Sequence, residues 1–270
     1  MVLHYDIDDV RPYINWVYFD HAWSMSGKSE ADKAPLYNDA RQMLDSWEGR
    51  YHTHAVFRIL PANSEGDDIV AGGIRLPMLR QQRPSAPGRP NLCLADFVRP
   101  ASLGQPDKVG VFATTVDEAP QRAYANDVYQ RMLAQVLADR LAEGTAELMH
   151  MQVRRHYWGY APNEQLSMAD LHAERYQGIR PAVGYPSMPD TSMNFLIDQL
   201  VGMRQIGIRL TSSGMMQPHA SVSGLMFAHP AAHYFDLGKI GEDQLRDYAH
   251  RRGLPVELVR SFLEHSLLKK

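Results

Sequence analysis

Apolar residues repeat with the period of a helix in several segments of this chain. In residues 35–48 they recur at intervals of three and four, which predicts an amphipathic helix with Pro35 in its first turn. The apolar face of this helix is formed by Leu36, Ala40, Met43, Leu44 and Trp47. Residues 124–160 carry the longest helical pattern, in which Gly144 is the one weak position, and residues 242–253 and 255–267 predict two short closing helices.

Other segments have the alternation of strands. Ala55, Phe57 and Ile59 share one face of a predicted strand that gives way to turn residues over 61–68. Further strands are predicted at 68–76, 92–98, 107–116, 220–230 and 233–240, the last two forming a hairpin. Residues 81–91 are dense in proline and glycine and predict an exposed loop. Residues 11–28 fit either a strand or a helix.

The order of these elements favours an α+β fold. Short connections between strands indicate a largely antiparallel sheet, and the helices fall into a few long segments. The chain shows no internal repeat and no low-complexity linker. We therefore expect one domain over residues 1–270, with residues 1–10 as a lead-in.

Charge and cysteine content narrow the function. A formal net charge of −3 and an isoelectric point near 6.4 provide no basic field, so a nucleic acid or a membrane is not an expected partner. The single cysteine, Cys93, lies in an apolar run and is expected to be a buried structural thiol. Neither a signal peptide nor a membrane span is visible, which predicts a cytoplasmic protein.

The familiar motifs of nucleotide and hydrolase sites are absent from the sequence. It contains no GxGxxG, no GxxxxGK[ST] and no GxSxG. His52 and His54 have a metal-ligand spacing but no accompanying carboxylate pattern, so we predict no metal site. Asp247, His250 and Gly253 approach a cobalamin-binding signature, but the histidine is one residue too far along, and a solvated helix face is the simpler interpretation.

The loop GIRPAVGYPSMPD, residues 178–190, is the strongest candidate for a site. Its prolines fix φ and stiffen the chain, so little entropy is lost on binding. Arg180 offers a planar fork for a carboxylate, and Tyr185 offers a ring face for a cation or a hydroxyl for a polar partner. A ligand with both a carboxylate and a positive centre fits this pair. The residues leave equally open that Arg180 only ties down loop carbonyls while Tyr185 packs.

At this loop the chain resembles the S-adenosylmethionine-binding activation domain of cobalamin-dependent methionine synthase, in which the run RPAxGYP is characteristic. The resemblance extends from about Arg11 to the closing helices, with matching segments in the family's order. These segments are INWVYFDHAWSMSGK, PANSEGDDI, LCLADFV, LADRLAEGTAELMH, VRRHYWGYAPNEQLS, ERYQGIRPAVGYP and ASVSGLMFAHPAAHYF.

The resemblance implies a helmet-like, C-shaped α+β domain with a bent antiparallel sheet and flanking helices. It implies S-adenosylmethionine as the cofactor, with cobalamin reached only through a partner protein. In this family, oxidised cob(II)alamin receives an electron from a flavodoxin or a flavoprotein reductase, and S-adenosylmethionine supplies the methyl group. The domain's task is then to position the methyl group against cobalt. Whether this chain counts as an enzyme, as a methyltransferase component, stays open.

By position in the family motifs, the resemblance assigns eight residues to the ligand site. Arg180 would bind the methionine carboxylate, the backbone of Ala182 would contact the ligand, and Tyr185 would face the methyl-transfer side as the catalytic candidate. The remaining assignments are Asn15, Glu143, Glu174, Tyr234 and Phe235. Glu143 lies on a long predicted helix, where a solvated glutamate is the commoner case.

Several positions depart from the family pattern. Asn15 stands where the family has an aspartate that accepts from the ligand, and loss of a charge-assisted contact costs about 1.5–3 kcal/mol. Other departures are expected on the face that touches the cobalamin module. They are Thr191, Ser192, Met193, Gln217, His219, Leu225 and Met226.

Three functions follow from the sequence. The first is a stand-alone reactivation subunit of a split methionine synthase, since no homocysteine, folate or cobalamin module precedes the motifs; reactivation of a different corrinoid methyltransferase is a variant of it. The second is a module that docks a corrinoid protein or flavodoxin and no longer uses S-adenosylmethionine. Asn15, in place of the family's aspartate, is the observation that motivates this hypothesis. The third is an enzyme acting on another small carboxylate in the same groove.

Overall fold

The core of the protein is a six-stranded antiparallel sheet. We describe a computed structural model that places residues 1–124 and 126–268. The strands run in the order β4-β3-β2-β5-β8, and β1 pairs with β2 beside this path. Their bounds are β1 Val2–Asp6, β2 His52–Glu65, β3 Asp68–Ala71, β4 Ile74–Pro77, β5 Asp107–Val116 and β8 Ser221–Met226. A separate pair is formed by β6 (Arg209–Leu210) and β7 (Met216–Gln217).

The long strand β2 organises the sheet. One of its edges pairs with β5 over residues 53–62, while its other edge pairs first with β1 and then, from Ala62 onward, with β3. Both faces of β2 are buried: Phe57 belongs to one hydrophobic cluster and Val56 to a second on the opposite side. The sheet is therefore covered on both faces, and its two ends have different neighbours.

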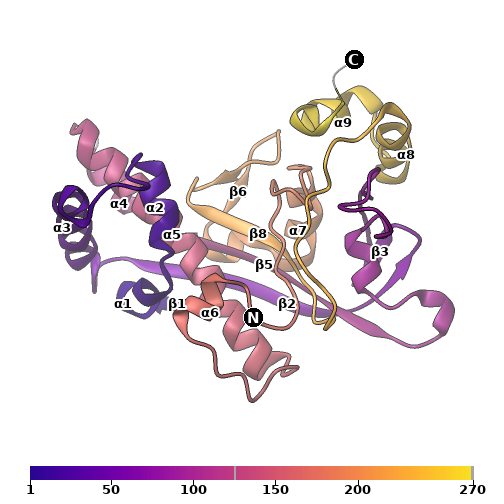
Figure 1. Ribbon diagram of the computed structural model, residues 1–270, viewed down its shortest axis with the longest axis horizontal. Coiled ribbons are helices and arrows are strands. Elements are labelled where there is room, and N and C mark those ends of the chain that lie inside the picture. Colours follow the sequence, from indigo (N-terminus) through magenta and orange to yellow (C-terminus); the bar gives the residue numbers. More distant parts are fainter. Residues whose placement is uncertain (125, 269–270) are drawn as a thin grey trace.

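Helices gather at the two ends of this sheet and along its length (Figure 1). Helices α2, α3 and α4 lie at one end, α8 and α9 lie at the other, and α5 runs from the first end across the sheet. The bounds are α1 Ile7–Val10, α2 Trp16–Ala22, α3 Glu30–Trp47, α4 Ala119–Ala123, α5 Val128–Gln152, α6 Met168–His172, α7 Met193–Val201, α8 Glu242–Arg252 and α9 Val256–Phe262. The predicted C-shaped α+β architecture with a bent antiparallel sheet is confirmed. Among the described residues, no helix combines the length and apolarity that a membrane span requires.

Helix α3 has the predicted apolar face but a different start. All five of its predicted core residues are buried. The helix begins at Glu30 because Ser29 caps it, accepting a hydrogen bond from the Asp32 backbone N–H at 3.2 Å. Pro35 therefore lies inside the helix and not in its first turn, so the prediction for this residue was wrong.

Two predicted strands do not form. Residues 92–98 contain a short 3-10 helix at Leu94–Phe97, because the Asp96 carboxylate accepts from the Cys93 backbone N–H at 2.8 Å. Cys93 is buried as predicted, and burial raises the pKa of its thiol to about 12. Residues 233–239 have no regular secondary structure and do not pair with β8, so the predicted hairpin is wrong. The turn predicted over 61–68 is also shorter, since β2 continues to Glu65.

Helix α5 carries one wall of the site described below, and Gly144 brings its neighbour close. A Cβ at this position would lie 3.1 Å from the Val10 side chain and 3.4 Å from the Tyr13 backbone. The glycine that weakens the helical pattern therefore allows residues 10–13 to pack directly on α5. This contact places Tyr13 and Asn15 at the edge of the same cavity as the helix.

The histidine candidates outside this cavity have ordinary partners. His52 Nε2 lies 3.1 Å from Asp6 Oδ1, and His54 Nε2 lies 2.9 Å from Asp117 Oδ1. Within residues 1–124 and 126–268, no group of three or more His, Cys, Asp or Glu is arranged to hold a metal ion. On α8, Asp247 and His250 are exposed, and Asp247 pairs with Arg251, which confirms the solvated helix face.

Candidate functional site

A cleft of about 590 Å³ brings together all eight residues assigned to the ligand site. Its walls come from helices α5 and α6, the start of α2, the loop at 180–187 and the segment 234–236. The assigned residues that line it are Asn15, Glu143, Glu174, Arg180, Ala182, Tyr185, Tyr234 and Phe235. Their contacts with a ligand stay predictions, but residues separated by up to 220 positions share one cavity.

The loop at 178–188 is held as an extra strand on the free edge of β8. Ile179 exchanges backbone hydrogen bonds with Phe227, and Val183 N–H donates to the Ser223 carbonyl at 2.9 Å. Glycine makes this approach possible, because a Cβ on Gly178 would lie 2.1 Å from the Phe227 oxygen. The loop owes its rigidity to these sheet contacts as well as to its prolines.

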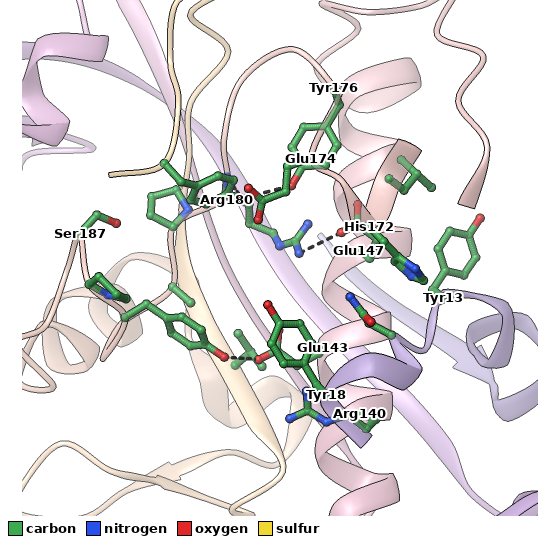
Figure 2. A pocket seen from close by; sticks show the side chains of 18 of the residues that line it. Tyr13, Tyr18, Arg140, Glu143, Glu147, His172, Glu174, Tyr176, Arg180 and Ser187 are labelled. Carbon is green, nitrogen blue, oxygen red and sulfur yellow. Dashed lines mark hydrogen bonds and ion pairs between the residues drawn. The ribbon is translucent and has the colours of Figure 1, made fainter. Parts of the chain in front are cut away.

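Arg180 extends from this loop toward α5 and is fixed at both ends (Figure 2). Its Nη2 lies 3.2 Å from Glu147 Oε2, and its Nη1 lies 3.2 Å from His150 Nδ1. Its backbone N–H donates to the Tyr234 hydroxyl at 2.9 Å. Burial, the largest single influence, would lower the pKa of Arg180, but Glu147 together with Tyr176, Tyr234 and Glu143 outweighs it, so the pKa is raised. The guanidinium therefore stays charged and aimed along the cleft.

A buried ionic network lies behind Arg180. Arg154, whose side chain is fully buried, makes two hydrogen bonds of 2.8 Å to the carboxylate of Glu164. Its guanidinium carbon lies 4.1 Å from the centre of the Tyr176 ring, and its Nη1 donates to His150 Nδ1 at 2.8 Å. The Tyr176 hydroxyl lies 3.1 Å from that of Tyr234, so the network returns to the loop that carries Arg180.

His150 is completely buried in this network and stays uncharged. Burial lowers its pKa well below 6.5, and the charges of Arg154 and Arg180 lower it further. The other groups that face it are the hydroxyl of Tyr160 and the ring of Tyr176.

This buried histidine predicts a pH dependence of stability. The unfolded chain takes up a proton near pH 6.5 that the folded protein does not accept, so the unfolded state gains stability as the pH falls. The free energy of unfolding is expected to decrease below about pH 6.5, with a slope of at most about 1.4 kcal/mol per pH unit from this residue. Urea titrations between pH 5 and 8 measure the slope. His150→Asn should reduce it, and an unchanged slope would contradict the assignment.

Tyr185 and Glu143 form the rim of the cleft. The Tyr185 hydroxyl donates to Glu143 Oε1 at 2.5 Å, while about half of the Tyr185 side chain remains exposed. Partial burial and the Glu143 charge raise the pKa of Tyr185, so its hydroxyl stays protonated. Glu143 is thus not the freely solvated glutamate that its helix position also allowed.

The other assigned residues contribute in different ways. Asn15 caps α2, its Oδ1 accepting from the Val17 N–H at 3.1 Å. Glu174 has a left-handed φ of 56°, and burial raises the pKa of its carboxyl group although Arg180 opposes the shift. Ala182 bridges to Gly224 through its backbone, and Phe235 packs beside Phe97.

The charges that line the cleft are predominantly negative. Two guanidinium groups, those of Arg140 and Arg180, stand among four carboxyl groups. The carboxyl groups belong to Glu143, Glu147, Glu174 and Asp236. Such a cavity favours a ligand whose carboxylate meets Arg180 while the rest of the molecule carries positive charge.

Sequence reasoning missed Glu147, His150, Arg154 and Tyr176. Glu147 lies one helical turn beyond Glu143, so the i, i+4 spacing could have placed it on the same wall. His150 and Arg154 repeat that spacing, but their burial depends on Glu164 and Tyr176 from later segments.

The expectation for the departures from the family pattern was wrong for most of them. Ser192 and Met193 are buried around the start of α7, and Leu225 and Met226 are buried in β8. Both faces of β8 are covered, so these side chains face the core and not a partner. Only Gln217 and His219 of this set are exposed.

Two comparisons with known proteins found similarity over nearly the whole chain. A family model described as "Vitamin B12 dependent methionine synthase, activation domain" matches residues 6–253. The solved structure "Crystal Structure of the MetH Reactivation Domain bound to AdoHcy" is similar to this chain, with 38% sequence identity and a TM-score of 0.93. That similarity covers 100% of this chain and 90% of the other.

Proposed function

Because this chain belongs to the family of the activation domain of vitamin B12-dependent methionine synthase, we propose that its cleft binds S-adenosylmethionine for the reductive methylation of cobalamin on a partner protein. The observation that carries the proposal is the combination of Arg180 with an acidic cleft, in a chain similar to a domain solved with AdoHcy. When bound, S-adenosylmethionine supplies the methyl group. The chain's residues hold and aim it.

The residues fit this ligand group by group. Arg180 offers a rigid, charged fork for the methionine carboxylate. Glu143, Glu147 and Glu174 offset the positive charges of the ammonium and the sulfonium, so the acidic surplus of the cleft is opposite in sign to the ligand's net positive charge. Tyr185 stands half-exposed at the rim with its hydroxyl tied to Glu143, where it presents its ring to the methyl-transfer side.

The partners belong to the same proposal. Cobalamin would be carried by a separate methionine synthase subunit acting in trans, and the electron would come from a flavodoxin or a flavoprotein reductase. The exposed side of Tyr185 is where a corrin ring would approach. A suitable test incubates the protein anaerobically with S-adenosylmethionine, a reductant and the cob(II)alamin form of a cobalamin-binding methionine synthase module. An absorption spectrum that stays that of cob(II)alamin would refute the reactivation role.

Removal of Arg180 should remove most of the affinity. Arg180→Ala eliminates the charge-assisted contacts to the ligand carboxylate and leaves Glu147 without its Arg180 partner, so we expect the Kd for S-adenosylmethionine to rise about 10–150-fold. Calorimetry measures this change. Arg246→Ala, an exposed position on α8, serves as the control and should bind like the wild type.

One observation favours the docking module as a second candidate. The oxygen of Asn15 is occupied by the cap of α2, and its amide carries no charge for the ligand ammonium. If calorimetry gives only millimolar binding that Arg180→Ala does not alter, the docking module replaces the reactivation subunit as the better description.

A further inference from the structure

We propose that His150 is a positioning residue: as a neutral imidazole it holds the Arg180 fork in the orientation that receives the ligand carboxylate. The inference deepens the proposed function and rests on it. His150 does not line the cleft, so it would act only through Arg180.

The hydrogen bonds define the tautomer of His150. Its Nδ1 lies 2.8 Å from Arg154 Nη1 and 3.2 Å from Arg180 Nη1. Both guanidinium groups can only donate, so Nδ1 must be the acceptor that they share. The ring proton is therefore on Nε2, which lies 3.3 Å from the Tyr160 hydroxyl and donates to it.

The surroundings fix the imidazole without any help from a ligand. Arg154 is anchored by its two hydrogen bonds to Glu164 and by the Tyr176 ring, so it cannot swing toward the cleft. The Tyr176 ring also meets the imidazole edge-on, at 5.2 Å and 89°. His150 is completely buried between these groups.

The consequence concerns the two arms of the Arg180 fork. One arm donates to His150 and the other to Glu147, so the plane of the guanidinium is set by two acceptors on successive turns of α5. Without the His150 acceptor, Glu147 can take both arms in the bidentate pairing that carboxylates prefer. The Arg180 guanidinium would then rotate toward Glu147, and fewer of its N–H groups would face a ligand carboxylate. Holding it in place before binding reduces the ordering cost of association.

Two substitutions and two ligands test the role. His150→Leu keeps bulk but removes the acceptor, whereas His150→Asn places an amide oxygen near the position of Nδ1. We expect His150→Leu to raise the Kd for S-adenosylmethionine about tenfold or more. His150→Asn should restore it to within about threefold of the wild type. For decarboxylated S-adenosylmethionine, which lacks the group that Arg180 recognises, both variants should match the wild type within about twofold.

Equal losses for the two ligands in His150→Leu would mean a general structural defect and would overturn the proposal, as would no loss for either. A measurement without ligand keeps the inference separate from the proposed function. In ¹⁵N NMR spectra between pH 6 and 8, His150 should show an unprotonated Nδ1 and a protonated Nε2. If the wild type binds no S-adenosylmethionine, the proposed function fails, and the NMR signals still decide the assignment: a protonated Nδ1 refutes it.

Discussion

Gly178→Ala is expected to destabilise the protein and to weaken ligand binding more than tenfold. The residue has a φ of 82°, and its added Cβ would lie 2.1 Å from the Phe227 carbonyl oxygen and 3.1 Å from the Tyr160 hydroxyl. The left-handed backbone costs an alanine about 1–2 kcal/mol, and the clash adds about 1–3 kcal/mol as the loop moves away from β8. Since Arg180 and Ala182 move with the loop, we expect calorimetry to show the loss of affinity together with the loss of stability.

The matched control is Gly207→Ala. Gly207 has nearly the same φ, 81°, but its Cβ would meet no atom within 4 Å. Gly207→Ala should therefore lower the free energy of unfolding by only about 1–2 kcal/mol, the cost of the left-handed backbone, and should bind ligand like the wild type. Equal effects of the two substitutions, measured by urea unfolding and calorimetry, would show that contact with Phe227 does not hold the loop.

Arg154→Leu is expected to cost about 3–5 kcal/mol of unfolding free energy. The substitution leaves the carboxylate of Glu164, whose side chain is 7% exposed, without the two hydrogen bonds that compensate its burial. It also removes the guanidinium from the face of the Tyr176 ring. Chemical denaturation measures the loss.

Arg175→Ala, which breaks an exposed ion pair, is the comparison for the buried pair of Arg154 and Glu164. Arg175 pairs with Asp170 at 2.7 Å, but its side chain is 70% exposed, so the loss should stay below about 1 kcal/mol. A similar small loss in Arg154→Leu would mean that Glu164 finds another partner or reaches water, contrary to the rigid network described above.

Much of the fold could be predicted from periodicity, and the failures have local causes. Strands β5 and β8 and the helices α3, α5, α8 and α9 follow their apolar patterns. Residues 92–98 are as apolar as a buried strand. The Asp96 carboxylate, however, accepts a hydrogen bond from the Cys93 backbone N–H and so favours a 3-10 helix in this segment. The sequence of residues 233–240 resembles a strand that would pair with β8, but the loop at 178–188 occupies that edge.

The sequence predicted some residues of the site and missed others, because burial by distant segments leaves no local pattern. Arg180 and Tyr185 stand in a loop whose prolines indicate stiffness, and the family motifs added six further positions in the same cleft. Glu147, His150 and Arg154 escaped because a helix face of charged residues usually indicates solvent. Only the arrival of Glu164, Tyr160 and Tyr176 from later segments buries that face, and no local pattern reports it.

The pairing of the loop at 178–188 with β8 has a consequence for solubility. β8 is the last strand of the sheet, and an uncovered edge strand offers unpaired N–H and C=O groups to other chains. Hydrogen bonds from Ile179 and Val183 and to Pro181 close that edge. We therefore expect the segment that carries Arg180 to limit self-association as well. A variant that loosens this loop, such as Gly178→Ala, should therefore aggregate more readily than the wild type.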